Sequence, residues 1–389
     1  MIAIKNGKII TPDEIIEDKV LMLEADRILG FADSAEGAEK VTDAHGRYIM
    51  PGLIDLHSDK LEQFVLPRPT SQMGFEFALR VFERDLLGAG ITTMYHSISL
   101  FANEIIGKSP LRTKDNVQKL ANLIADIHFQ YHLIHHRFHL RTEVDNFEAF
   151  DIVRNMIDQS KVHEISFMDH SPGQGQYVNL DYYHDTVINY GGKEISTIGF
   201  DGIMEYHRTK TVLSFEQLKE LADLAHAKNI PVASHDDDTA VKLDINKGLG
   251  VDISEFPITI AAAKSAKKHG FYTVVGAPNI LRGSSHSGNM SAAEAILEGC
   301  ADILCSDYYP ATILHGVFLM HSKYHMPLPQ MVNMATLNPA KATRTDKDYG
   351  SIKSGKKADL LIVDTLDGYP AITHAFVDGL PVSRIEYRK

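Results

Sequence analysis

The feature that most constrains the fold is a repeated alternation of short apolar runs with stretches of helical periodicity. Each run is rich in β-branched residues and precedes a polar cluster, and eight such runs begin near residues 52, 91, 137, 163, 230, 253, 272 and 302. One helical stretch, FEQLKELADLAHAKN, has apolar residues three and four positions apart. Strands that alternate with helices build parallel sheets, and eight such units close into a barrel. We therefore predict an α/β protein with a (β/α)8, TIM-like barrel over residues 51–349.

The two ends of the chain have a different pattern. Residues 1–50 and 350–389 contain short strands of alternating character joined by turns such as Asn-Gly and Ala-Asp. A chain of 389 residues, of which 44% are hydrophobic, is long enough for one large domain and one small one. The pattern predicts that both termini together form a small β-sandwich domain beside the barrel.

Composition argues against several classes of protein. The formal net charge of −12 disfavours a general nucleic-acid-binding surface, which needs many lysine and arginine contacts to phosphates. No apolar run approaches the roughly 20 residues that span a bilayer, and the start MIAIKNGKIITPDE lacks the order of a signal peptide. We expect a cytoplasmic protein with no nucleic-acid or membrane partner. Cys300 and Cys305 match no disulfide or zinc pattern and are expected to be reduced core thiols.

Metal-binding side chains stand at the ends of several predicted strands. In a (β/α)8 barrel the carboxyl ends of the strands meet on one face, where reactive groups gather. Because side chains alternate along a strand, His57 and Asp59 point to the same side and can chelate one ion. A mixture of imidazole and carboxylate donors suits zinc, manganese, iron or nickel better than calcium. The strand-end candidates are His57, Asp59, Glu143, Asp169, His170, His235, Asp236 and Asp307.

Simpler roles compete with metal binding at each of these positions. A single histidine at a strand end is more often a hydrogen-bonded structural residue than a metal ligand. Five strand ends that carry metal-competent groups on one face of one barrel make a mononuclear or dinuclear site the better interpretation. Asp236, Asp237 and Asp238, together with Thr239, can instead form the N-cap and first turn of a helix, and we favour this role over metal binding.

Two further segments carry groups suited to an anion. GAPNILRGSSHSGN follows a predicted strand and offers backbone N–H, hydroxyl and guanidinium donors for phosphate oxygens, although a flexible loop is the alternative. In LPRP, Arg68 is held between two prolines on a stiff segment, which suits an anion clamp but is also common in plain loops. Arg208 and Lys210 are expected to be solvated surface residues.

The connection that follows His170 is unusually long. Its part SPGQGQYVNLDYYHDTVINYGGKE is rich in glycine, tyrosine and glutamine. Long connections in compact domains are often functional, so residues 171–210 suit an active-site lid better than a structureless linker.

Segments along the whole chain resemble the amidohydrolase superfamily. NGKIITPDE, YIMPGLIDLHSD, ATLNPAKAT and GSIKSGKKADLLIVD follow the order of its recurring segments, and a barrel beside a terminal β-domain fits it. Most members carry His-X-His at the first strand, whereas this sequence has His57-Ser58-Asp59. HSDKLEQFVLPRP, MDHSPGQGQY, ASHDDDTA, EFPIT, GAPNILRGSSHSGN and DILCSDYYPATIL are more specific. They resemble the alpha-D-ribose 1-methylphosphonate 5-triphosphate diphosphatases, the subgroup encoded with the carbon-phosphorus lyase.

This resemblance implies an activity and a set of site residues. The activity is hydrolysis of a ribosyl alkylphosphonate 5-triphosphate to the 5-phosphate and diphosphate during phosphonate breakdown. One or two divalent ions are implied, with zinc favoured over manganese, iron and nickel, and Glu143 replaces the bridging carboxylated lysine of other members. The implied metal ligands are His57, Asp59, Glu143, His170, His235 and Asp307, of which Asp307 is also the catalytic proton acceptor. The implied substrate contacts are Arg282, Ser284, Ser285 and His286, with Arg68 and Lys60 as weaker candidates.

Two other functions fit parts of the sequence. An amidohydrolase that cleaves a cyclic amide or deaminates a heterocycle would use the same water and the same aspartate, but the phosphate-suited loop argues against it. A non-catalytic metal-binding or scaffold protein would have lost ligands, and none is missing apart from the exchange of histidine for Asp59. The expected partner is therefore a small phosphorylated molecule, and a homodimer is the expected assembly because dimers are the commonest oligomers.

Overall fold

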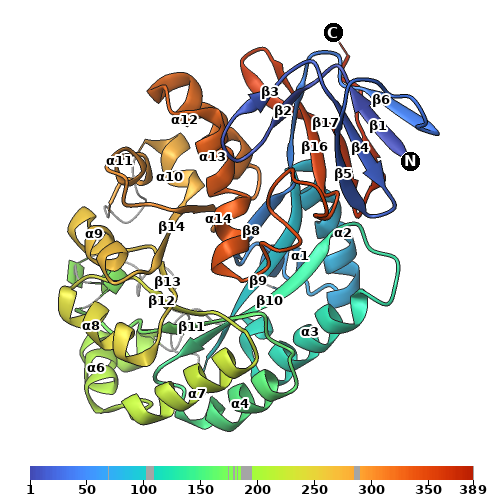
Figure 1. Cartoon of the computed structure of the whole chain (residues 1–389). Helices are drawn as coiled ribbons and strands as arrows, with labels where there is room; N and C mark the ends of the chain where they lie inside the picture. Colours follow the sequence, from blue (N-terminus) through green and yellow to red (C-terminus); the bar gives the residue numbers. More distant parts are fainter. Residues whose placement is uncertain are drawn as a thin grey trace.

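The computed structural model places a barrel beside a strand-rich part that contains both chain termini (Figure 1). The structure describes residues 1–68, 70–101, 109–173, 175–177, 180–181, 183–184, 195–283 and 290–388.

Eight parallel strands form the barrel sheet and are paired in sequence order. They are β8 (Leu53–Ser58), β9 (Ile91–Leu100), β10 (His135–Glu143), β11 (Glu164–Met168), β12 (Val232–His235), β13 (Ile253–Glu255), β14 (Tyr272–Gly276) and β15 (Ile303–Cys305). A bridge between Ser58 and Asp307 brings the first and last strands together. Each of the eight apolar runs in the sequence is one of these strands, so the predicted barrel is confirmed.

Helices surround the barrel strands (Figure 1). They are α1 (Leu61–Val65), α2 (Phe75–Gly88), α3 (Lys114–Ile127), α4 (Phe150–Asp158), α6 (Ile195–Thr209), α7 (Phe215–Ala227), α8 (Ala240–Leu249), α9 (Ile260–Lys268), α10 (Ala277–Arg282), α11 (Ala292–Leu297), α12 (Thr312–Tyr324), α13 (Leu328–Met334) and α14 (Leu337–Ala342). The helix α7 shows how the pattern works: it begins after the capping box of Ser214 with Gln217 and buries Leu221, Ala222 and Ala225. The largest core cluster lies between the helices and the outer faces of the strands.

The remaining strands form two sheets that share an apolar core. They are β1 (Ile2–Lys5), β2 (Lys8–Ile10), β3 (Ile15–Ile16), β4 (Val20–Glu24), β5 (Arg27–Ala32), β6 (Lys40–Asp43), β7 (Tyr48–Pro51), β16 (Leu360–Leu366), β17 (Tyr369–Val377) and β18 (Leu380–Arg384). One sheet has the order β5-β4-β1-β6 and the other β18-β17-β16-β7-β2-β3. Because β7 pairs with β16, strands from both ends of the chain share one sheet. The predicted sandwich is confirmed, and the division into residues 1–50 with 350–389 and residues 51–349 stays a prediction.

Gly52 forms the junction between the sandwich and the barrel, between β7 and β8. A Cβ atom at this position would lie 2.1 Å from Oγ1 of Thr92, a residue of β9. A glycine is therefore needed for the chain to pass from one part to the other at such close range. Cys300 and Cys305 are buried free thiols, as predicted.

The described parts of the connection after His170 pack against the carboxyl end of the barrel. The Gly175 N–H donates to Asp238 Oδ2 over 2.9 Å. Lys210 was predicted to be a solvated surface residue, and this is wrong, because its side chain is buried and its Nζ donates to Asp145 Oδ2 over 2.7 Å. Arg208 is exposed, as expected.

Candidate metal centre

The six predicted metal ligands all lie at the carboxyl end of the barrel. Three lie on strands and three lie one or two residues beyond a strand, where the chain turns toward the next helix. His57 is on β8, Glu143 ends β10 and His235 ends β12, while Asp59, His170 and Asp307 follow β8, β11 and β15 respectively.

Contacts connect four of these residues to one another. Nδ1 of His170 lies 2.9 Å from each carboxylate oxygen of Glu143. Burial lowers the pKa of His170, but the negative charge of Glu143 and its hydrogen bond together outweigh burial and raise the pKa above its ordinary value. The ring of His170 lies 6.3 Å from that of His235, which in turn lies 5.4 Å from that of His57. Side chains from four strands therefore face one small region.

Asp307 joins this region through the backbone. Its N–H donates to the His57 carbonyl over 2.9 Å, and the Asp59 N–H donates to the Asp307 carbonyl over 3.1 Å. Asp307 has the left-handed φ of 58°. Burial, with repulsion from Asp59 as the next cause, raises the pKa of Asp307 to about 7. The first and last strand ends thus bring three of the predicted ligands together.

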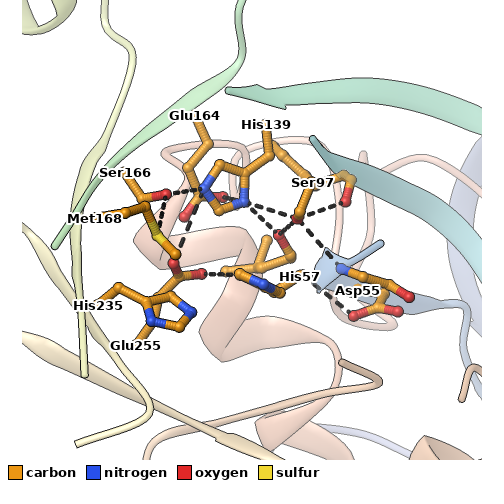
Figure 2. Close-up of polar contacts among 12 residues, drawn as sticks. Asp55, His57, Ser97, His139, Glu164, Ser166, Met168, His235 and Glu255 are labelled. Atoms are coloured by element: carbon orange, nitrogen blue, oxygen red, sulfur yellow. Dashed lines mark hydrogen bonds and ion pairs between the residues drawn. The ribbon is translucent and has the colours of Figure 1, made fainter. Parts of the chain in front are cut away.

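The orientation of His57 is set by a residue that sequence reasoning missed. Figure 2 shows His57 beside Glu255, the last residue of β13, with Nδ1 of His57 2.8 Å from Glu255 Oε1. This contact leaves Nε2 of His57 as the ring nitrogen available to a metal ion. Burial, followed by the positive charge of Arg141, lowers the pKa of His57 well below its ordinary value. The ring is therefore neutral, which is the form that ligates metals.

A second missed residue, Asp55, secures the strand that carries His57. Asp55 Oδ1 accepts from the His57 N–H over 3.3 Å and from the Ser306 N–H over 3.0 Å. Burial raises the pKa of Asp55 to about 6. Asp55 therefore connects β8 to the segment that leads to Asp307.

His139 lies deeper in the barrel and serves a structural role. His57, His139 and Glu255 offer ligand atoms within 4.8 Å of one another. Both ring nitrogens of His139 already have partners, however: Nδ1 lies 3.0 Å from the Leu56 carbonyl, and Nε2 lies 2.9 Å from Ser166 Oγ (Figure 2). His139 supports the inner wall of the site, and the six predicted ligands lie nearer the carboxyl end of the barrel.

The donor set fits a divalent ion. Glu255 Oε2 is buried and has no hydrogen-bond partner in the part of the chain that the structure describes. Nδ1 of His235 lies 2.8 Å from Asp236 Oδ2, so its other ring nitrogen remains available. Imidazole nitrogens and carboxylate oxygens, with carboxylates behind the histidines, are typical of zinc and manganese sites.

Two arginines near the site were not foreseen. Arg141 lies on β10 between His139 and Glu143, is buried, and has an Nε without a hydrogen-bond partner among the described residues. Arg112 donates from Nε to Glu62 Oε1 over 2.7 Å, and its Nη2 lies 3.7 Å from Asp59 Oδ2. The period of two along HHRFHLRTE places Arg141 on the same face as Glu143, so that arginine had a signal in the sequence.

The predicted substrate contacts have different positions. The Lys60 ammonium lies 5.9 Å from the centre of the Tyr309 ring, close to the loop of Asp307. Arg68 is exposed, and Arg282 is exposed at the last residue of α10. Ser284, Ser285 and His286 lie outside the described residues.

The run of three aspartates does not cap the following helix. Thr239 is the N-cap of α8, and its Oγ1 accepts from the Lys242 N–H over 3.3 Å. Asp236 instead contacts His235, and Asp237 Oδ2 accepts from the hydroxyls of Ser234 and Ser254. The N-cap prediction is therefore confirmed for Thr239 and wrong for Asp236 and Asp237, whose partners lie on β12 and, in the case of Ser254, on the adjacent β13.

A parallel eight-stranded barrel, a sandwich made by both termini and donors at the carboxyl face define a metal-dependent hydrolase of the amidohydrolase type. The model of the amidohydrolase family matches residues 188–384. The chain is 33% identical to alpha-D-ribose 1-methylphosphonate 5-triphosphate diphosphatase of Escherichia coli strain K12, over 97% of this chain and 98% of the relative. It is 22% identical to imidazolonepropionase of Picrophilus torridus, over 97% and 95% of the two chains. The protein belongs to the amidohydrolase family.

Solved structures support the same fold. The crystal structure of an amidohydrolase superposes with a TM-score of 0.67 over 100% of both chains, at 16% identity. None of the described helices is long and apolar enough to cross a membrane.

Proposed function

We propose that the protein hydrolyses alpha-D-ribose 1-methylphosphonate 5-triphosphate, or a related ribosyl alkylphosphonate triphosphate, to the 5-phosphate and diphosphate. The observation that carries this proposal is the 33% identity to the diphosphatase over nearly the full length of both chains. The reaction would serve the breakdown of phosphonates.

The donors at the carboxyl face would hold one or two divalent ions, with zinc favoured. Such an ion lowers the pKa of bound water and offsets negative charge that develops on phosphoryl oxygens. The residues that would hold it are His57, Asp59, Glu143, His170, His235 and Asp307.

Asp307 is the proposed proton acceptor. It lies beyond the last strand, and its backbone is hydrogen-bonded to the backbones of His57 and Asp59, two of the other proposed ligands. A carboxylate in this position can orient the attacking water and take its proton as oxygen attacks phosphorus. The bond from that phosphorus to the leaving diphosphate breaks in the same displacement.

Positive charge near the donors suits a triphosphate. Arg141 is buried with an unpartnered Nε among the described residues, and Arg112 lies beside Asp59. Guanidinium groups bind phosphate oxygens through two parallel hydrogen bonds, so one or both arginines can neutralise the polyanion. This explains how a chain with a net charge of −12 can take a highly charged substrate.

Further substrate contacts are proposed on the loops around the site. Lys60 lies close to Tyr309, a residue of the loop that follows Asp307. Arg282 ends α10, directly before the segment with Ser284, Ser285 and His286, and Arg68 follows α1.

The experiment that tests this function combines metal analysis with two product assays. Purified, metal-loaded protein is given ribose 1-methylphosphonate 5-triphosphate and, in parallel, a panel of cyclic amides and aminated heterocycles. We expect release of diphosphate from the triphosphate and neither ring opening nor ammonia from the panel. Full metal loading without diphosphate release would refute the substrate, and turnover of a panel compound would favour a conventional amidohydrolase.

A further inference from the structure

A second cluster of metal-competent side chains lies at the opposite end of the barrel. His135 is the first residue of β10, Asp359 directly precedes β16 and Asp378 directly follows β17. His135 and Glu143 are the two ends of one strand, which at about 3.3 Å per residue separates them by roughly 26 Å. The cluster therefore lies between the barrel and the sandwich and is separate from the candidate metal centre.

The spacing of the three side chains suits a metal ion. Nε2 of His135 lies 3.0 Å from Asp359 Oδ2 and 3.8 Å from Asp378 Oδ2. The three residues offer ligand atoms that all lie within 4.8 Å of one another. Donor atoms around a tetrahedral ion, with bonds of about 2.1 Å, are roughly 3.4 Å apart.

Two of the donor atoms are buried without a hydrogen bond. His135 Nε2 and Asp359 Oδ2 have no hydrogen-bond partner among the described residues, although only 3.0 Å separates them. The side chains of His135 and Asp359 are each only 7% exposed. An imidazole and a carboxylate left unsatisfied in this way are costly, and a shared cation would satisfy both.

The other carboxylate oxygen of each aspartate is occupied, which leaves one oxygen of each for the ion. Asp359 Oδ1 accepts from the Asp378 N–H over 2.8 Å, and Asp378 Oδ1 lies 2.8 Å from Lys357 Nζ. Each aspartate thus retains one oxygen, its Oδ2, on the side of His135.

The local charge favours a further cation. Lys357 also lies 2.6 Å from Asp26 Oδ2, so one ammonium group is shared between two carboxylates. Asp359, the third carboxylate of the region, has His135 as its ion-pair partner instead of this lysine. The ring of Tyr349 packs edge-on against His135 with 5.1 Å between ring centres, which covers the imidazole.

We propose that His135, Asp359 and Asp378 bind a divalent transition-metal ion that fastens the sandwich to the barrel. One imidazole and two carboxylates are donors that suit zinc or manganese. The amino-terminal face of such a barrel commonly serves stability, so the role of this ion is structural. The site does not depend on the proposed diphosphatase activity.

Metal content tests the proposal. The chain is stripped of metal, reloaded with zinc, dialysed, and analysed by mass spectrometry for zinc per chain. We expect His135→Gln and Asp359→Asn to bind about one ion fewer per chain than the wild type, with turnover unchanged. His45→Gln, which removes an exposed histidine from the sandwich, should bind as much zinc as the wild type. Equal zinc content in all four proteins would overturn the proposal.

Crystal diffraction from the zinc-loaded wild type tests whether an ion binds at the proposed site, even if the variants fail to fold. An anomalous peak at the zinc absorption edge, located between His135, Asp359 and Asp378, would support the site. A peak only at the carboxyl face of the barrel would overturn it, whether or not the diphosphatase activity is found.

Discussion

At the scale of single residues, Asp307 carries the proposed chemistry. Replacing its carboxylate by an amide preserves size and backbone contacts but removes the proton acceptor. We expect Asp307→Asn to fold with an unchanged circular dichroism spectrum and to lose diphosphate release by at least about a hundredfold. Turnover near that of the wild type would remove Asp307 from the mechanism.

Glu255 contacts His57 and would act on the candidate metal centre through it. Its contact with Nδ1 fixes the ring, and loss of such a carboxylate typically weakens metal binding by about 10–100-fold. We expect Glu255→Ala to show this loss in zinc competition with a chelator. Glu255→Gln keeps an oxygen that can accept from Nδ1 and should recover part of the affinity. Equal affinity in the wild type and Glu255→Ala would show that Glu255 does not position His57.

Residues that close a strand with a metal-competent group could be predicted from sequence, because strand order alone places them on one face. Glu255 closes β13 in the same way, but its significance depends on reaching His57 across the barrel. The pairing of β8 with β9 also has a register irregularity between Asp55 and Ser58, next to His57, which local sequence does not reveal. Arg112 precedes a helix and reaches Asp59 only through the fold, so its position could not be predicted either.

At the scale of elements, the junction between β7 and β8 depends on Gly52. A methyl group there would collide with Oγ1, Cγ2 and Cβ of buried Thr92. We expect Gly52→Ala to lower the free energy of unfolding by roughly 1–3 kcal/mol or more, measured by urea denaturation. Adding Thr92→Ala removes two of the three colliding atoms and should restore part of the loss.

The control for this variant is Gly88→Ala. Gly88 is the exposed last residue of α2 and has open space around it. The added methyl group should be neutral or slightly stabilising. If Gly52→Ala and Gly88→Ala have the same effect, close packing at the junction does not limit stability.

The strands were predictable because apolar runs and helical periodicity are local properties. The prediction that the run of aspartates caps a helix failed because the partners of these residues are not set by local sequence alone. Asp236 has a left-handed φ of 53°, and Asp237 is bound by the hydroxyl of Ser254 on the adjacent strand. A local N-cap rule could not anticipate a partner that only sheet formation supplies.

At the scale of the whole molecule, buried histidines make stability depend on pH. Burial, with Arg137 as the next cause, lowers the pKa of His163 to about 3, and burial holds the pKa of His96 well below its ordinary value. Below about pH 6.5 the unfolded chain binds protons on these residues while the folded chain does not. Their contribution to the free energy of unfolding therefore decreases as the pH is lowered. We expect a loss of about 1.4 kcal/mol per such histidine between about pH 7.5 and about pH 5.5, measured by urea denaturation.

Single variants separate the contribution of one buried histidine from that of other titratable groups. In His163→Gln the free energy of unfolding should change less between about pH 7.5 and about pH 5.5, by the amount expected for one histidine. In His45→Gln, which replaces an exposed histidine, it should change as much as in the wild type. The same change in all three proteins would show that His163 does not contribute.

The pairing of β7 with β16 has a consequence for the order in which the molecule is made. Pro51 pairs with Leu360, so the edge of β7 lacks this partner while the whole barrel is being synthesised. Contacts between such distant segments form slowly, and an unpaired strand edge is open to association with other chains. A premature stop before β16 would therefore affect residues made at the very beginning, and a ribosome that stalls there would hold a nascent chain whose first strands remain unprotected.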